Sequence, residues 1–340
     1  MQTAMSQHAA HATARDGKEP CWVLMGPTAG GKTELSLELA RRCPMEIVSV
    51  DSMQVYRGMD IGTAKPGLEA RRQVPHHMID VLEPEETFNV GEFCRMALEA
   101  IVGIRARGRR PLLVCGAPMY LKALLWGLLP TPGADPALRE RLREQAARHG
   151  AGALHHRLAE LDPAAARRIA GNDLKRIERA LEVRYLTGLP ISAQQGQFDG
   201  PARVEYVAVG LRWPRQALYE RIERRVDGMM AAGLLEEVRG LEGRLGPQAS
   251  QAVGYKELSA HLRGEMTLEE AVGLIKRNTR RLAKHQITWF RHFPGVEWLD
   301  MPALSDAQDR ARQWEQIAKA LTIPRRSAII GAVQWGGDLP

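Results

Sequence analysis

Short apolar runs recur along the first half of the chain and return once near residue 210. Four of them have the length and composition of buried strands and cover residues 23–25, 45–50, 110–116 and 204–211. Between them, apolar residues recur at helical spacing over 34–42 and 91–107, and the second helix would bury Phe93, Ala97, Ile101 and Ile104. Strands that alternate with helices predict an α/β fold, a parallel sheet core flanked by helices.

The pattern changes in the middle of the chain. From residue 135 to about 197 one helical pattern follows another, with almost no β-branched runs. The strand at 204–211 then resumes the sheet, which predicts an inserted all-helical domain. A single long helix is predicted over 213–239. The predicted parts are a disordered tail at 1–20, a catalytic core at 21–130 and 200–300, the helical insertion at 131–199 and a C-terminal extension of unknown role at 301–340.

A glycine-rich segment joins the first predicted strand to the first predicted helix. It reads Gly-Pro-Thr-Ala-Gly-Gly-Lys-Thr, which is G-x-x-x-x-G-K-T in the strand–loop–helix context of a phosphate-binding loop. Backbone N–H groups and the helix N-terminus of such a loop attract phosphate, Lys32 adds a mobile positive charge, and the Thr33 hydroxyl can hold Mg²⁺. We predict a diphosphate site, with Mg²⁺ at Thr33, made of Gly26, Pro27, Thr28, Ala29, Gly30, Gly31, Lys32 and Thr33.

Asp51 follows the second predicted strand, at the end of the sheet where ligands bind in open parallel folds. Its spacing alone fits either a Mg²⁺ ligand or a catalytic base. The strand over 110–116 ends without an Asp, which disfavours an ordinary ATPase or kinase, because those enzymes place a Walker B carboxylate there. His76 and His77 are adjacent and point to opposite sides, so we interpret them as structural residues rather than metal ligands.

A basic segment near the end of the predicted core indicates a polyanionic partner. Between Lys276 and His292 there are six Lys or Arg residues, two His and no acidic residue. Like charges at i,i+4 spacing repel unless an anion lies across them. Trp289 and Phe290 follow, which fits a nucleic-acid backbone with stacked bases or, alternatively, aromatic residues that fill the core. The first basic row is Lys276, Arg280 and Lys284, and the second basic row is Arg277, Arg281 and His285.

Two other segments carry clusters of positive charge. In the long predicted helix, Arg221, Arg224 and Arg225 are interleaved with Glu220 and Glu223, and we interpret two of the three arginines as a solvated face paired with these acids. In the insertion, a helix carrying Lys175, Arg176, Arg179 and Arg184 is diluted by Asp173, Glu178 and Glu182, so its charge alone does not decide between a binding and a solvated surface.

Composition narrows the class of protein. A chain of 340 residues that is 44% hydrophobic can bury a large core. It has no run of eighteen apolar residues and no apolar leader, so we expect no membrane span and a cytoplasmic location. The four cysteines form no C-x-x-C pair, which indicates neither a zinc site nor a disulfide framework. The net charge of +7 favours a polyanionic partner.

Five segments together resemble the tRNA dimethylallyltransferase (tRNA isopentenyltransferase) family. The resemblance covers about residues 21–300, and the long second segment, joined to this phosphate-binding loop, is close to diagnostic. The segments are the loop itself, Asp-Ser-Met-Gln-Val-Tyr-Arg-Gly-Met-Asp-Ile-Gly-Thr-Ala-Lys-Pro at 51–66, Pro-His-His-Met-Ile-Asp at 75–80, Ala-Val-Gly-Tyr-Lys at 252–256 and Lys-His-Gln-Ile-Thr-Trp-Phe-Arg at 284–291.

The resemblance implies a P-loop NTPase-like core and transfer of a dimethylallyl group from dimethylallyl diphosphate to N6 of adenine 37, in tRNAs that read codons starting with U. The loop then holds a prenyl diphosphate and Mg²⁺ instead of ATP. Asp51 would be the general base on the adenine amine, and Lys32 and Arg221 would neutralise the leaving diphosphate. The insertion would grip the anticodon stem-loop. We expect the protein to act as a monomer.

The resemblance also implies a set of tRNA contacts. Two residues depart from the family pattern, because Gly30 stands where Ser is frequent and Ala117 replaces a threonine. A small-molecule kinase and an enzyme that prenylates free adenine nucleotides remain as alternatives. A kinase would not explain the helical insertion, and an enzyme acting on free nucleotides would have no use for the basic rows. The expected tRNA contacts are Asp51, Ser52, Met53, Gln54, Ala117, Lys175, Arg176, Arg179, Gln251, Gly254, Tyr255, Lys256, Arg277, Arg281, Lys284, His285, Gln286, Thr288, Trp289 and Arg291.

Overall fold

The computed structural model describes residues 20–128, 132–194, 198 and 200–301. The predicted tail and C-terminal extension lie outside these ranges, apart from Pro20 and Met301. The chain forms two compact units: a core unit of Met1–Leu121 with Val204–Pro340, and a helical unit of Lys122–Arg203. Within the described ranges, no helix is both long and apolar enough to cross a membrane.

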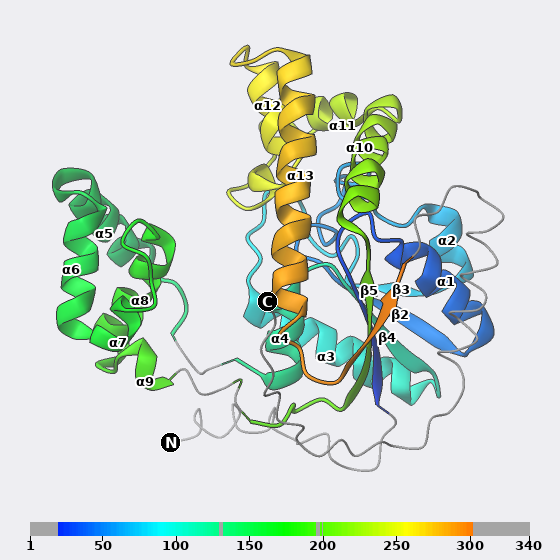
Figure 1. The fold of residues 1–340 in the computed structure, drawn as a ribbon, viewed down its shortest axis with the longest axis horizontal. Helices are drawn as coiled ribbons and strands as arrows, with labels where there is room; N and C mark the ends of the chain where they lie inside the picture. The colour runs from blue at the N-terminus through cyan, green and yellow to red at the C-terminus, as the bar shows by residue number, and fades with distance from the viewer. Residues whose placement is uncertain (1–19, 129–131, 195–197, 199, 302–340) are drawn as a thin grey trace, which may run out of the picture. The chain divides into compact units, whose positions relative to one another are not determined.

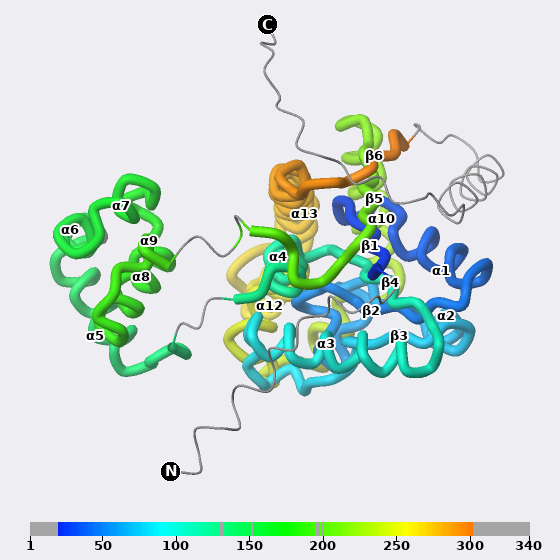
Figure 2. The backbone as a smooth tube through the Cα atoms, turned by 90° about the horizontal axis from the view of Figure 1, so that it is seen from below, coloured from blue at the N-terminus to red at the C-terminus, as the bar shows by residue number. Residues whose placement is uncertain are grey.

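A six-stranded parallel sheet forms the centre of the core unit (Figure 1). Its order is β3-β2-β4-β1-β5-β6, and the strand labels follow one another in this order in Figure 2. The predicted α/β fold and the four predicted strands are confirmed, while the last strand was not predicted. The strands are β1 (Cys21–Met25), β2 (Met45–Val50), β3 (His76–His77), β4 (Arg110–Cys115), β5 (Tyr206–Arg212) and β6 (Val296–Asp300).

Helices cover both faces of this sheet. α1 (Lys32–Arg42) leads from β1 to β2, and α3 (Val90–Ala106) leads back from β3 to β4, so right-handed crossovers place the two helices on opposite faces. The face of α1 joins a buried cluster that includes Leu24, Ile47 and Leu112. α3 buries the four residues predicted from its periodicity, and the capping box of Asn89 and Glu92 fixes its start.

The remaining helices of the core unit lie before and after the inserted helical unit. α2 (Leu68–Gln73) and α4 (Pro118–Trp126) precede it, although the end of α4 already belongs to the helical unit. After β5 come α10 (Arg215–Ala231), α11 (Leu234–Gly240), a short 3₁₀ helix η2 (Ala249–Gln251), α12 (Tyr255–Leu262) and α13 (Leu268–Phe290).

The single long helix predicted over 213–239 is wrong. The chain forms α10 and α11 as two helices, because Gly233 adopts a left-handed conformation with φ of 96°. The apolar pattern did not reveal this break because Leu234 and Val238 are also buried and continue the period of α10.

Besides the end of α4, the helical unit contains five helices within its described residues. Asp135, Asp162 and Asp173 each accept a hydrogen bond from a backbone N–H in the first turn of the helix that follows. Leucine and alanine side chains around Leu142 and Leu158 form its core. The helices are α5 (Pro136–His149), α6 (Ala151–Leu161), α7 (Pro163–Ala166), α8 (Leu174–Thr187) and α9 (Ile191–Gln194).

Candidate active site

The phosphate-binding loop, residues 26–33, curls between β1 and α1 at the carboxyl end of the sheet. Gly31 has φ of 85° and Ala29 has φ of 59°, so two left-handed residues turn the backbone back on itself. The stretch Thr28–Thr33 lines a cavity of about 510 Å³. This is the backbone arrangement that the G-x-x-x-x-G-K-T pattern predicts for an anion site.

Two side chains from the segment after β5, far from the loop in sequence, hold the loop in this shape. The indole Nε1 of Trp213 donates to the carbonyl of Gly30 (3.1 Å), and Nε of Arg221 donates to the carbonyl of Ala29 (2.8 Å). The Arg221 guanidinium also stacks over the Trp213 ring, 4.4 Å from its centroid. Arg221 therefore supports the loop backbone, and its predicted contact with the diphosphate stays a prediction.

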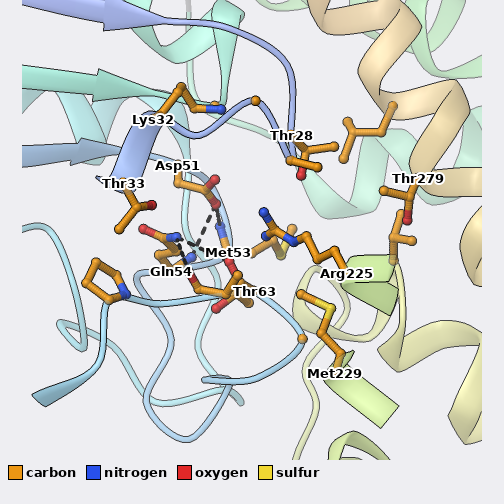
Figure 3. A pocket seen from close by; sticks show the side chains of 18 of the residues that line it. Thr28, Lys32, Thr33, Asp51, Met53, Gln54, Thr63, Arg225, Met229 and Thr279 are labelled. Carbon is orange, nitrogen blue, oxygen red and sulfur yellow. Dashed lines mark hydrogen bonds between the residues drawn. The ribbon is translucent and has the colours of Figure 1, made fainter. Parts of the chain in front are cut away.

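Lys32 lies at the start of α1 with its ammonium directed back over the loop (Figure 3). Its Nζ donates to the carbonyl oxygens of Gly26 (2.9 Å) and Pro27 (2.8 Å). Burial, followed by the positive charge of Arg225, lowers the pKa of Lys32 to about 8. A bound anion would stabilise the protonated form, so the site is suited to a ligand with negative charge.

Asp51 lies where β2 ends and turns its carboxylate into the same cavity (Figure 3). Its Oδ1 accepts hydrogen bonds from the backbone N–H groups of Met53 (2.8 Å) and Gln54 (3.3 Å). No described residue donates a hydrogen bond to Oδ2. Gly116, just after β4, leaves room for this oxygen, because a Cβ there would lie 2.8 Å from it. One carboxylate oxygen is thus fixed, and the other is available to a ligand.

Arg225 is a site residue that the sequence motifs did not predict. Its guanidinium extends into the cavity toward Asp51 (Figure 3), and no described residue forms a hydrogen bond or ion pair with it. The predicted pairing with Glu220 and Glu223 does not apply to Arg225, because Glu223 pairs with Arg280 (2.7 Å) and Glu220 accepts from Gln216. Arg224 is exposed, as the solvated-face interpretation expects. Spacing offered a signal, since Arg225 follows Arg221 by four residues and so shares its face of α10.

The cavity also has an extended apolar lining. A ligand that combines a charged diphosphate with a short hydrocarbon group matches a cavity that has both kinds of surface. Its apolar lining includes Ile47, Ile79, Val114, Val226, Met229, Leu234 and Ile275.

The Thr33 hydroxyl is a side-chain oxygen at this cavity that could hold Mg²⁺. Thr33 is exposed and lines the cavity, whereas the described residues contain no group of three His, Cys, Asp or Glu side chains that could hold a metal. Mg²⁺ commonly takes only one or two protein ligands and completes its shell with phosphate oxygens and water. The residues present therefore fit Mg²⁺ bound together with a diphosphate.

The predicted tRNA contacts on α13 divide into exposed and buried residues. The first basic row differs from its prediction, because Lys276 and Arg280 form ion pairs with Asp227 (2.6 Å) and Glu223 (2.7 Å) of α10, which runs alongside (Figure 1). The neighbouring helix therefore neutralises part of this row. The exposed residues are Arg277, Arg281, Lys284, His285, Thr288, Trp289 and Arg291.

Gln286 and Phe290 point the other way, into the core unit. Gln286 accepts from the Thr28 N–H through Oε1 (2.8 Å) and donates from Nε2 to the Gly116 carbonyl (2.6 Å). Phe290 is fully buried and packs near Phe293. Of the two aromatic residues, only Trp289 is exposed, so the core-filling alternative holds for Phe290.

The other predicted contacts lie in several places. Gln251 and Lys256 are exposed, whereas Gly254 and Tyr255 are buried. Ser52 and Met53 lie beside Asp51 and are partly exposed. Gln54 is also partly exposed, but its side-chain amide is already engaged: Oε1 accepts a hydrogen bond from the Ser49 hydroxyl, and Nε2 donates to the Thr63 carbonyl.

Ala117 is half-buried at the end of β4 and does not line the cavity; its N–H donates to the Val50 carbonyl (3.0 Å). In the helical unit, Lys175 and Arg176 are exposed on α8. Arg179 instead bonds Glu182 (2.5 Å) and the Pro132 carbonyl (3.0 Å). The tRNA contacts of all these residues stay predictions.

Family models match most of the chain. A model described as IPP transferase matches residues 54–293, and one described as isopentenyl transferase matches residues 20–74. A tRNA dimethylallyltransferase of Symbiobacterium thermophilum is 52% identical over 307 residues, which cover 89% of this chain and 95% of that protein. The chain belongs to the tRNA dimethylallyltransferase family. A second member, from Desulforudis audaxviator, is 49% identical over 86% of this chain and 96% of its own length.

Solved structures of the tRNA dimethylallyltransferase family share the fold. A tRNA isopentenylpyrophosphate transferase from Bacillus halodurans matches with a TM-score of 0.65 and 42% identity, over 89% of this chain and 97% of its own. A eukaryotic dimethylallyltransferase acting on tRNA matches with a TM-score of 0.72 and 27% identity, over 89% of this chain and 80% of its own. The P-loop NTPase-like architecture predicted from the resemblance is confirmed.

Proposed function

We propose that this protein transfers the dimethylallyl group of dimethylallyl diphosphate to N6 of adenine 37 in tRNAs that read codons starting with U. Membership in the tRNA dimethylallyltransferase family supports this activity. The observation that carries it is the shared cavity, in which the phosphate-binding loop, Asp51 and an apolar lining meet. Each of the three matches one part of the reaction: leaving group, proton acceptor and prenyl chain.

The cations of the cavity bind and stabilise the leaving group. In the transfer step the bond between C1 of the prenyl group and the diphosphate oxygen breaks, and a bond from N6 to C1 forms. Negative charge then builds up on the diphosphate. Lys32, Arg225 and the loop N–H groups are placed to stabilise it, because all of them line the cavity in a partly buried setting.

Asp51 accepts the proton that N6 loses. The exocyclic amine of adenine is a weak nucleophile and becomes strongly acidic as the new bond forms, so a positioned base is needed. Oδ2 of Asp51 has no donor among the described residues, while Oδ1 is held by two backbone N–H groups. The turn that holds Oδ1 orients the carboxylate, and Oδ2 takes the proton.

In this proposal, the Thr33 hydroxyl and the diphosphate would be ligands of Mg²⁺. When bound, it supplies positive charge that offsets the diphosphate charge in the ground state and in the transition state. Thr33 would hold it through its hydroxyl, because this residue is exposed and lines the cavity.

The tRNA would bind through the exposed side of α13 and the basic residues of α8. Adenine 37 must leave the stacked anticodon loop to reach the cavity, at a cost of a few kcal/mol. Contacts between phosphates and exposed residues such as Arg277, Arg281 and Lys284 would offset that cost.

One labelling experiment separates this function from its alternatives. Dimethylallyl diphosphate carrying a radiolabel in the prenyl group is offered with unmodified tRNA, with AMP, or with neither acceptor, in the presence of Mg²⁺. We expect label in tRNA and not in AMP, and nuclease mapping should place it at adenine 37. Label in AMP but not in tRNA would establish the nucleotide-prenylating alternative, and ATP turnover without prenyl transfer would establish a kinase or ATPase.

A further inference from the structure

One wall of the cavity is a loop rather than a helix or strand. Gly62, Thr63, Ala64 and Pro66 line the cavity from the segment after β2. Gln54 holds this segment from the side of the sheet, because its Nε2 donates to the carbonyl oxygens of Thr63 (3.2 Å) and Ala64 (3.4 Å). These are bonds between near neighbours in the chain, so they do not tie the loop to another wall of the cavity.

Glu237 of α11 makes that connection. Its Oε2 accepts from the backbone N–H groups of Asp60 (3.0 Å) and Ile61 (2.7 Å), and its Oε1 accepts from the N–H of Gly62 (3.1 Å). Three successive N–H groups directed at one anion form the kind of nest that binds phosphate elsewhere in proteins. Here a carboxylate from a helix 175 residues or more away along the chain fills the nest.

Tyr255, the first residue of α12, completes the connection. Its hydroxyl donates to Oε1 of Glu237 (2.5 Å), and its side chain is fully buried. Burial, followed by the charge of Glu237, raises the pKa of Tyr255 above its ordinary value, so the hydroxyl remains a donor. The ring packs directly on the loop, because a Cβ on Gly62 would lie 2.4 Å from Cε2 of Tyr255.

The connection joins two walls of the same cavity. Leu234 of α11 and the stretch Ala252–Gly254 before α12 line a neighbouring part of the cavity. Glu237 and Tyr255 do not line the cavity themselves. They lie behind it and carry the hydrogen bonds that hold residues 60–62 against α11 and α12.

We propose that Glu237 is a positioning residue for prenyl transfer, whose carboxylate locks the loop at 60–64 onto α11 and α12 and so sets the shape of the donor cavity. The proposal rests on the proposed function for the reaction it affects. It also reassigns Tyr255, expected from the resemblance to contact tRNA, as the partner of Glu237 in this lock.

Variants of Glu237 test the lock. In Glu237→Ala, three N–H groups and one hydroxyl lose their acceptor, so the loop wall loosens and the donor is held less accurately. We expect KM for dimethylallyl diphosphate to rise about tenfold and kcat to fall about tenfold, while KM for tRNA changes less than about twofold. Glu237→Gln keeps one oxygen acceptor and should lie between the wild type and Glu237→Ala.

Glu236→Ala is the matched control. Glu236 is the preceding residue of α11, is exposed, and pairs with Arg239 (2.5 Å) instead of the loop. Its removal should leave both KM values and kcat unchanged. All assays are performed well below the melting temperature of each variant, so that a change in the kinetic constants cannot come from unfolding. A Glu237→Ala enzyme with a lower melting temperature but unchanged kinetic constants would overturn the proposal.

Hydrogen exchange tests the lock without any assay of activity. Exchange of the amides of residues 60–62 should accelerate in Glu237→Ala, accelerate less in Tyr255→Phe, and stay at the wild-type rate in Glu236→Ala. Unchanged exchange in Glu237→Ala would show that no lock exists. If the wild type failed to prenylate tRNA, the proposed function would fall, and the exchange rates would still decide whether Glu237 holds the loop.

Discussion

Asp51 is the residue whose two oxygens have different surroundings. In Asp51→Asn the side-chain oxygen can still accept the N–H groups of Met53 and Gln54, so the turn after β2 should survive. The variant lacks a base, so we expect the single-turnover rate of prenyl transfer to fall by about a hundredfold or more, with tRNA affinity within a few-fold of the wild type. Rapid-quench kinetics and filter binding measure the two quantities. Near-normal chemistry in Asp51→Asn would give Asp51 a structural or metal-binding role.

Ala117 is the residue at which the chain departs from its family's threonine. A hydroxyl bonded to a charged group contributes about 1.5 to 3 kcal/mol. Asp51, Lys32 and Arg225 supply larger electrostatic contributions in the cavity, so we expect Ala117→Thr to raise the single-turnover rate by less than about tenfold. An inactive wild type that gains activity from the threonine would show that this hydroxyl is indispensable.

Motifs predicted the site residues that lie next to one another in sequence. The spacing of the loop placed Lys32 and Thr33, and the strand before Asp51 placed its carboxylate beside them. Arg225 lies far along the chain on a helix with two other arginines, and periodicity could not say which of them would enter the cavity. Glu237 has no motif at all, because its role depends on a loop that approaches only in the folded chain.

At the scale of elements, prediction was best for elements buried against the sheet or within it. α3 buries one face, β2 is buried at every residue, and both lie where the apolar pattern places them. The break between α10 and α11 depends on the backbone of Gly233 and does not change the spacing of apolar residues. The pairing of Lys276 and Arg280 depends on α10, a partner helix that local spacing cannot reveal.

The two basic rows of α13 should therefore differ in their effect on tRNA binding. Arg277 and Arg281 are exposed and form no ion pair with a described residue, whereas Lys276 and Arg280 pair with α10. We expect Arg277→Ala with Arg281→Ala to weaken tRNA binding and to reduce the slope of log K against log salt by about two, one for each lost phosphate contact.

The matched control removes the same number of charges from the same helix. Lys276→Ala with Arg280→Ala should change the salt slope less, while the binding of dimethylallyl diphosphate stays unchanged in both double variants. If Arg277→Ala with Arg281→Ala had the same salt slope as the wild type, these two arginines would be solvated surface residues without a role in tRNA binding.

At the scale of the whole molecule, each unit contains a buried carboxylate surrounded by arginine. In the core unit, a hydrogen bond from Arg107 opposes burial and, with a further bond from His77, lowers the pKa of Glu46 to about 2. In the helical unit, burial disfavours the charge of Glu182, but hydrogen bonds from Arg139 and Arg179 outweigh it and lower its pKa to about 2 as well. Both acids are ionised in the folded protein at neutral pH.

This arrangement predicts acid lability. A carboxylate whose pKa is lower in the folded chain contributes stability above its unfolded pKa, and that contribution disappears as the pH falls toward the folded value. Urea unfolding should show a falling free energy between about pH 4.5 and pH 2, on the order of 3 kcal/mol for Glu46. Glu46→Gln should flatten this dependence for the core unit. If the free energy of unfolding of Glu46→Gln fell as steeply with pH as that of the wild type, Glu46 would not contribute to the acid lability.

Gly116 limits which side chains the end of β4 can carry beside Asp51. Nucleotide hydrolases of related architecture carry an acidic residue at the end of the corresponding strand. Here any side chain at residue 116 would begin 2.8 Å from Oδ2 of Asp51, and an acid would add a second negative charge beside it. Asp51 would have to move before residue 116 could become acidic. Acquiring a hydrolase-type acid at residue 116 would therefore disturb the carboxylate that prenyl transfer is proposed to use.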